Sequence, residues 1–146
     1  MKYIGYCRKS TDESDRQILS IESQIDELKE FASRQNLEIL DIVTEARTAK
    51  SPGRPYFNDV LKRIESGEAQ GIISWHPDRL ARNSIDGGKI IYLLDTGKLI
   101  DLKFPSFWFE NSPQGKFVLN IPFYQEVRNY FKGTSASSPP KPMYYS

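Results

Sequence analysis

Residues 71–82 read GIISWHPDRLAR, and the organisation of the chain can be built outward from them. The run 71–75 is short and mostly apolar and is stopped by Pro77, which is the pattern of a buried β-strand. The polar and basic motif D-R-L-x-R of residues 78–82 follows at once. In open parallel sheets ligands bind at the carboxyl ends of strands, so this motif is the first candidate for a binding site.

Upstream of this strand the sequence predicts a strand, a helix and a second strand. Residues 3–7 and 37–43 have the apolar and aromatic content of strands. For the helix between them, Ser20 is a suitable N-cap and Asn36 a suitable terminator. The apolar positions of that helix recur at helical spacing: Ile21, Ile25, Leu28 and Ala32.

The rest of the chain continues the alternation of strands and helices. A helix is expected over residues 57–64, ended by Gly67, and another over residues 84–94. Residues 99–104 and 107–109 are candidate strands separated by a proline. This order predicts an α/β fold with a mostly parallel central sheet of four to five strands flanked by helices.

The composition is that of one ordinary globular domain. The chain has 146 residues, of which 38% are hydrophobic and 27% charged. It lacks both the roughly 18-residue apolar run of a membrane helix and the apolar core of a signal peptide, so we expect a cytoplasmic protein that does not bind membranes. With Cys7 as its one cysteine and His76 as its one histidine, neither a disulfide nor a zinc site is predicted. The net charge of +1 means that any charge used to bind DNA must be local.

The first candidate for chemistry is the pattern Y-x-R-x-S at the end of the N-terminal strand. Side chains alternate along an extended segment, so Tyr6, Arg8 and Ser10 should project to one side. A guanidinium can hold a phosphate in two hydrogen bonds beside the serine hydroxyl. Taken alone, the pattern is more often a polar strand end with a surface arginine.

The second candidate is the D-R-L-x-R motif. Arg79 and Arg82 are three residues apart and are expected to share a helical face, and Asp78 is placed to pair with Arg82. Alone, this could be a solvated helix start with an ion pair worth less than ~1 kcal/mol. His76 is interpreted as a turn or strand-end residue rather than a catalytic one, which leaves the general base unassigned.

The joint order of these features resembles the resolvase/invertase family of serine site-specific recombinases. Y-x-R-x-S lies on the first strand, a polar and basic loop follows the second, and D-R-L-x-R follows the third. The resemblance runs from about residue 2 to residue 121 and includes S-x-x-x-Q at 20–24, G-R-P at 53–55 and P-x-G-K at 113–116. The chain is most similar to the N-terminal domain of large serine recombinases, which implies a resolvase-type catalytic domain over residues 1–121.

The resemblance implies that Ser10 is the nucleophile that attacks a DNA phosphodiester and forms a 5′-phosphoserine intermediate. The other implied catalytic residues surround the scissile phosphate: Arg8, Arg79, Arg82, Asp78 and Tyr6. Several guanidiniums can stabilise the charge that a metal ion would otherwise neutralise, so neither a metal nor another cofactor is expected. DNA is the expected partner.

Supporting roles fall on residues around this cluster. Glu45 and Arg54 match the family's acidic and basic positions in the second loop, although the acidic position is often Asp, and Thr48 lies in the same loop. Either Gln17 or Gln24 would contact the phosphate or the nucleophile loop. The sequence does not choose between these two glutamines.

The expected similarity ends in the last helix, which in the family is long and mediates dimer formation and DNA contact. Pro122 costs ~3 kcal/mol inside a helix. Residues 122–131 are therefore interpreted as an aborted or divergent start of that helix, and residues 132–146 as a disordered tail. Assembly into a dimer or tetramer is doubtful here, and we expect the chain as given not to recombine DNA by itself. An inactive recombinase remnant and a small α/β phosphate-binding protein are the alternatives.

Overall fold

The computed structural model of the chain describes residues 1–10 and 19–118, which form a four-stranded, all-parallel sheet. The order across the sheet is β2-β1-β3-β4. The strands are β1 (Lys2–Arg8), β2 (Glu38–Glu45), β3 (Gly71–Ser74) and β4 (Asp101–Lys103). The predicted α/β fold with a mostly parallel sheet is confirmed.

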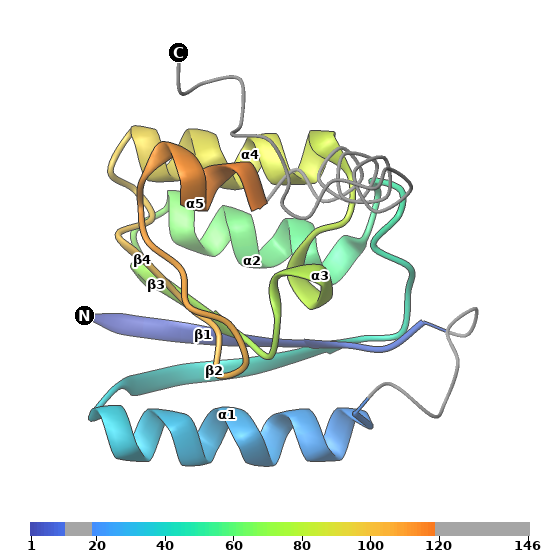
Figure 1. Cartoon of the computed structure of the whole chain (residues 1–146), viewed down its shortest axis with the longest axis vertical. Coiled ribbons are helices and arrows are strands. Elements are labelled where there is room, and N and C mark those ends of the chain that lie inside the picture. The colour runs from blue at the N-terminus through green and yellow to red at the C-terminus, as the bar shows by residue number, and fades with distance from the viewer. Residues whose placement is uncertain (11–18, 119–146) are drawn as a thin grey trace, which may run out of the picture.

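Helices cover both faces of the sheet (Figure 1). Helix α1 lies on one face, and the other described helices lie on the opposite side. Their bounds are α1 (Ile21–Gln35), α2 (Pro55–Glu65), α3 (Pro77–Leu80), α4 (Ser84–Asp95) and α5 (Pro113–Val118).

Strand β1 separates two apolar cores because its side chains alternate between the faces of the sheet. Tyr3 and Cys7 pack in a core with Leu28 of α1. Ile4 and Tyr6 belong to the larger core under α2 and α4. The alternation places Tyr6 and Arg8 on the side of the sheet that α2 and α4 cover.

The predicted signals at the ends of the first two helices are confirmed. The Ser20 hydroxyl accepts a hydrogen bond from the Ser23 amide at 3.1 Å, which satisfies one of the free donors of the first turn. Asn36 ends α1 in the left-handed conformation, with φ of 56°. Gly67, with φ of +84°, allows the turn that follows α2.

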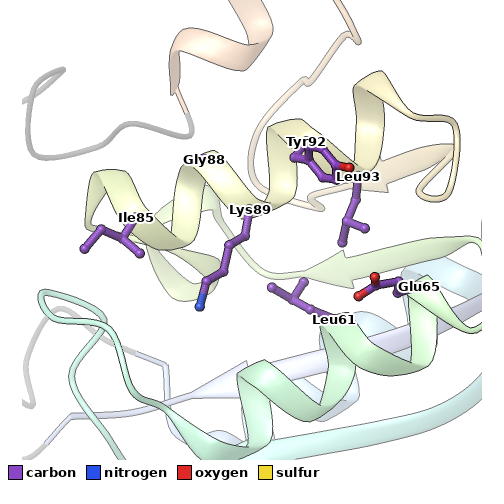
Figure 2. Close-up of a pocket in the computed structure, with 7 residues that line it drawn as sticks. All are labelled: Leu61, Glu65, Ile85, Gly88, Lys89, Tyr92 and Leu93. Carbon is purple, nitrogen blue, oxygen red and sulfur yellow. The ribbon is translucent and has the colours of Figure 1, made fainter.

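Helices α2 and α4 pack side by side on their face of the sheet. Figure 2 shows Leu61 of α2 and Leu93 of α4 pointing toward one another across the groove between the helices. Both leucines are buried in the larger core. The two helices therefore share one apolar core on this face of the sheet.

One predicted element is wrong, and one predicted residue has an additional role. Residues 107–109 are not a strand. Ser106 instead turns the chain back, donating from its amide and its hydroxyl to the carbonyl of Trp75, and one isolated bridge joins Phe104 to Phe107. Pro77 does not merely stop β3 but opens α3, because a proline fits the first turn of a helix, where its missing N–H is not needed.

The predicted segments 122–131 and 132–146, with Pro122, lie outside the described residues. In the part of the chain that the structure describes, there is no helix of the length and apolar character needed to span a bilayer.

Candidate active site

The carboxyl ends of three neighbouring parallel strands deliver the predicted residues to one edge of the sheet. In the register of β1 and β2, Arg8 is opposite Glu45, and in that of β1 and β3, Tyr6 is opposite Ser74. The Lys9 amide extends the ladder by donating to the Glu45 carbonyl at 3.0 Å. The serine that follows Lys9 therefore sits just beyond the end of β1.

Ser10 is buried, with 3% of its surface exposed. It is the last described residue before the segment 11–18, in which the predicted Gln17 lies outside the described residues. The alternative glutamine, Gln24, is buried on α1 and binds the backbone on both sides of that segment. Its amide nitrogen donates to the carbonyls of Arg8 and Leu19, each at 3.0 Å, and its oxygen accepts from the Arg8 amide at 3.1 Å. Gln24 thus holds the backbone at Arg8 and at Leu19, on either side of the stretch that contains Ser10.

The Arg8 side chain is fully buried and joins two loops of the carboxyl edge. Its Nε and Nη2 donate to the carbonyls of Arg79 and Asp78, at 3.0 and 2.7 Å. Its Nη1 donates to the carbonyl of Arg47, in the loop after β2, at 3.1 Å. Arg79 returns a bond from Nη1 to the Arg8 carbonyl, at 3.3 Å. Through these bonds Arg8 fixes the loop after β3 against β1.

The short helix α3 carries two of the predicted residues. His76 caps it, with the Asp78 amide 3.2 Å from Nδ1, and the same nitrogen lies 2.9 Å from Oδ1 of Asp78. His76 is thus part of a turn, as predicted, and also contacts a residue of the predicted cluster. Arg79, 5% exposed, lies with Nε 3.5 Å from Oδ1 of Asp78.

Arg79 and Arg82 do not share a helical face, so that expectation is wrong. Helix α3 ends at Leu80, and Ala81 is extended, with φ of −151° and ψ of 139°. The Leu80 carbonyl accepts a hydrogen bond from Arg54, and the Arg82 amide donates to Ala49, so tertiary contacts end the helix. The predicted pair of Asp78 with Arg82 is replaced by contacts of Asp78 with His76 and Arg79.

The charges around Asp78 keep it ionised. Burial would raise the pKa of this carboxyl, but the hydrogen bond and charge of His76, and the charges of Arg79 and Arg82, outweigh burial and lower the pKa to about 2. Asp78 is therefore a fixed negative charge beside two guanidiniums at any pH above about 4.

Asp78→Asn should remove part of the acid sensitivity of the fold. The folded-state pKa is about 2 and the ordinary value is 3.8, so the unfolded chain binds more protons between these values. The carboxylate then stabilises the fold above about pH 4, and this contribution disappears as the pH falls toward 2. For a partly exposed group we expect about 1 kcal/mol after solvent screening. In urea unfolding, the free energy of unfolding should be higher for the wild-type protein than for Asp78→Asn near neutral pH, and this difference should shrink at low pH. A difference that does not depend on pH would contradict this assignment.

Behind these residues lies a buried polar network centred on Tyr6. Its hydroxyl donates to Oε1 of Glu45 at 2.5 Å and accepts from Nη1 of Arg54 at 3.0 Å. Glu45 also accepts from the amides of Tyr56 and Phe57, each at 3.0 Å, and so caps α2. Burial raises the pKa of Tyr6 far above its ordinary value, although the charge of Arg54 opposes the shift. Tyr6 therefore stays protonated and acts as a donor, not as a base.

Two members of this network were missed in the sequence. Asp86 accepts from Nη2 of Arg54 at 3.1 Å, and Asn83 bridges Asp86 Oδ2 and the Ala49 carbonyl from Nδ2, at 2.8 and 3.1 Å. Asn83 also caps α4 by accepting from the Asp86 amide at 2.8 Å. An Asn followed three residues later by an acidic residue is a capping signal that could have identified both.

Thr48 belongs to the loop between Glu45 and α2, as predicted. Its hydroxyl accepts from the Lys50 amide at 3.1 Å. Within residues 1–10 and 19–118, no group of three His, Cys, Asp or Glu side chains could hold a metal ion.

The chain matches a known family over most of its length. Residues 3–122 match the family described as Resolvase, N terminal domain. A resolvase family site-specific recombinase from Streptococcus pneumoniae has a similar structure, with a TM-score of 0.64 and 24% identity over 90% of this chain and 91% of that one. The N-terminal catalytic domain of TP901-1 integrase gives a TM-score of 0.63 and 21% identity over 92% of this chain and 100% of that one. The C-terminal catalytic domain of ISC1926 TnpA, an IS607-like serine recombinase, gives 0.61 and 16% identity over 89% and 83%.

Proposed function

Because this chain belongs to the resolvase N-terminal domain family, and is thus a serine recombinase catalytic domain, we propose that Ser10 forms a covalent bond with a DNA phosphate, which is the first step of cutting and rejoining DNA. The observation that carries the proposal is the position of Ser10. It lies two residues after the end of β1, whose last residue, Arg8, is hydrogen-bonded to the backbone of Asp78 and Arg79. A hydroxyl nucleophile and a group of guanidiniums are thereby tied to one edge of the sheet.

In the proposed reaction the Ser10 oxygen attacks phosphorus and loses its proton. The Oγ–P bond forms, the bond from phosphorus to the 3′ oxygen breaks, and that oxygen leaves as a hydroxyl after accepting a proton. The phosphoserine ester retains the energy of the broken linkage, so a 3′ hydroxyl of another strand can reverse the step without ATP. This reversal, on an exchanged strand, is recombination.

The proposed roles of the other residues follow from the charge that develops during attack. Arg79 and Arg82 stabilise the nonbridging oxygens, and Asp78 orients the guanidinium of Arg79, whose Nε lies 3.5 Å from its Oδ1. Arg8 completes the positive surroundings of the phosphate and holds this group together through the carbonyls of Asp78 and Arg79. Tyr6, Glu45 and Arg54 form the buried network that supports this cluster. Gln24 positions the backbone on either side of Ser10.

The test is to trap the covalent intermediate. The full chain is incubated with supercoiled plasmids that carry a randomised insert, the mixture is denatured, and protein-linked DNA is recovered and sequenced. After nuclease and trypsin digestion, Ser10 lies in the peptide STDESDR, residues 10–16. A nucleotide attached through phosphate to Ser10 of this peptide is the expected result, and wild-type protein without any adduct would contradict the proposal.

Arg82→Lys should slow adduct formation by about a hundredfold, the usual order for loss of one stabilising donor. Lysine keeps the charge but cannot make the planar, paired hydrogen bonds that a guanidinium makes to phosphate. The matched control is Arg63→Lys, since Arg63 binds Asp41 and Glu68 on the surface of α2. Adduct yield is followed over time for both variants. Equal rates in the two variants would show that the guanidinium of Arg82 does not act on the phosphate.

A further inference from the structure

The loop between β2 and α2 contains a hollow that is separate from the arginine cluster. The hollow is lined by residues 46–48 and 51–54. Its wall includes the hydroxyl-bearing Thr48 and Ser51 and the guanidinium-bearing Arg47, which are donors suited to a phosphate oxygen. The hollow is separate from the groove between α2 and α4 shown in Figure 2.

The loop between β2 and α2 carries positive charge, and it contains no acidic residue that would balance this charge. Residues 46–58 include Arg47, Lys50 and Arg54 and no Asp or Glu. Arg54 is buried and is held by Asp86, and Lys50 does not line the hollow, so Arg47 is the exposed cation at the wall of the hollow. In a chain with a net charge of only +1, an exposed cation in a loop without acidic residues is a place where an anionic partner would bind.

The hollow is also fixed in place by residues of the candidate active site. The Arg47 carbonyl accepts from Nη1 of Arg8, at 3.1 Å. The buried Ala49 accepts at its carbonyl from the Arg82 amide and from Nδ2 of Asn83, each at 3.1 Å. The backbone of this loop is therefore anchored beside the arginine cluster, which is the requirement for two sites that bind one polymer.

We propose that the hollow around Arg47 binds a second phosphodiester of the DNA strand, next to the one that Ser10 attacks. This inference rests on the proposed function and extends it. Arg47 would contact the phosphate, with the Thr48 and Ser51 hydroxyls as further donors, and the contact would set the register of the strand without reading its sequence. Arg47 is in this role a binding residue and takes no part in the chemical step.

The test is the salt dependence of DNA affinity. Binding of the full chain to a fluorescent mixed-sequence duplex of about 20 base pairs is measured by anisotropy from about 50 to about 200 mM salt. Loss of one phosphate contact should reduce the slope of log affinity against log salt by about 0.9 in Arg47→Gln. The matched control is Arg34→Gln, because Arg34 is an exposed arginine of α1 on the opposite face of the sheet. A slope that is unchanged in Arg47→Gln, or reduced equally in Arg34→Gln, would overturn the inference.

A second measurement follows the side-chain Nε–Hε signal of Arg47 by NMR. Duplex DNA should shift this signal and leave that of Arg34 in place. Inorganic phosphate, added at the same phosphate concentration, should have a much weaker effect; an equal effect would identify a site for free phosphate and overturn the assignment to DNA.

The two proposals fail in different ways. A reduced slope in Arg47→Gln with no adduct on Ser10 would leave the DNA-binding hollow standing and remove the recombinase chemistry. An adduct on Ser10 with a full slope in Arg47→Gln would do the reverse.

Discussion

Ser10→Ala is expected to abolish the covalent protein–DNA adduct while leaving DNA affinity nearly unchanged. The substitution removes one oxygen from a residue that is already buried, and the described groups that carry positive charge to this edge remain. If Ser10 is the nucleophile, no later step can proceed, because strand exchange begins from the phosphoserine. The loss should therefore be complete rather than partial.

The measurement is the same adduct assay, read on the peptide of residues 10–16. That peptide contains two other hydroxyls, Thr11 and Ser14, so Ser14→Ala provides a control on the same segment and should retain the adduct. Fluorescence anisotropy with duplex DNA gives the affinity of each variant. An adduct in Ser10→Ala, located on Thr11 or Ser14 by fragmentation, would show that a different residue attacks.

The layers of the fold could be predicted because their signals are local. Ser20 and Asn36 mark the ends of α1 through their own capping geometry, and the apolar spacing between them fixes which face packs on the sheet. The parallel sheet then follows from alternation of strands and helices. These features depend on residues that are close in sequence, and they hold in the structure.

The details that failed depend on contacts between distant residues. The end of α3 is set by Arg54, which takes the Leu80 carbonyl from 26 positions away. The turn in place of the strand at 107–109 is set by Ser106, which binds Trp75. The periodicity within a segment carries no information about such contacts. The spacing of Arg79 and Arg82 therefore predicted one helix for both, although α3 ends between them, at Leu80.

The sequence predicted which residue types lie at the strand ends of the candidate site. It did not predict the contacts that each of these residues makes. Arg8 is at the predicted edge, yet its guanidinium is buried and bonded to three carbonyls. Gln24 binds backbone on both sides of the nucleophile segment. Both positions show that much of the polar sequence near the site serves to hold loops in place, which only the tertiary structure reveals.

The ion pair of Arg54 and Asp86 connects the supporting network to α4 and should be the most sensitive polar contact in the fold. Arg54 is 1% exposed and Asp86 is fully buried, and their side chains meet at 3.1 Å. Removing one charge leaves the other buried and unpaired, which costs about 3–5 kcal/mol in comparable cases. We therefore expect Asp86→Asn to lower the free energy of unfolding by about 3–5 kcal/mol.

Asp95→Asn is the matched control, since Asp95 lies on the same helix and pairs with Lys116 but is about half exposed, so its loss should cost less than about 1 kcal/mol.

The buried pair is also incompletely satisfied, because Nε of Arg54 and Oδ1 of Asp86 find no hydrogen-bond partner among the described residues. A pair of this kind contributes little beyond apolar packing, so replacing both residues, as in Arg54→Met with Asp86→Leu, should recover most of the stability lost in Asp86→Asn. Urea unfolding of the three variants measures these differences. A double variant as unstable as Asp86→Asn would mean that the hydrogen bonds of Arg54 to Tyr6 and Leu80, rather than its charge balance with Asp86, hold this part of the fold together.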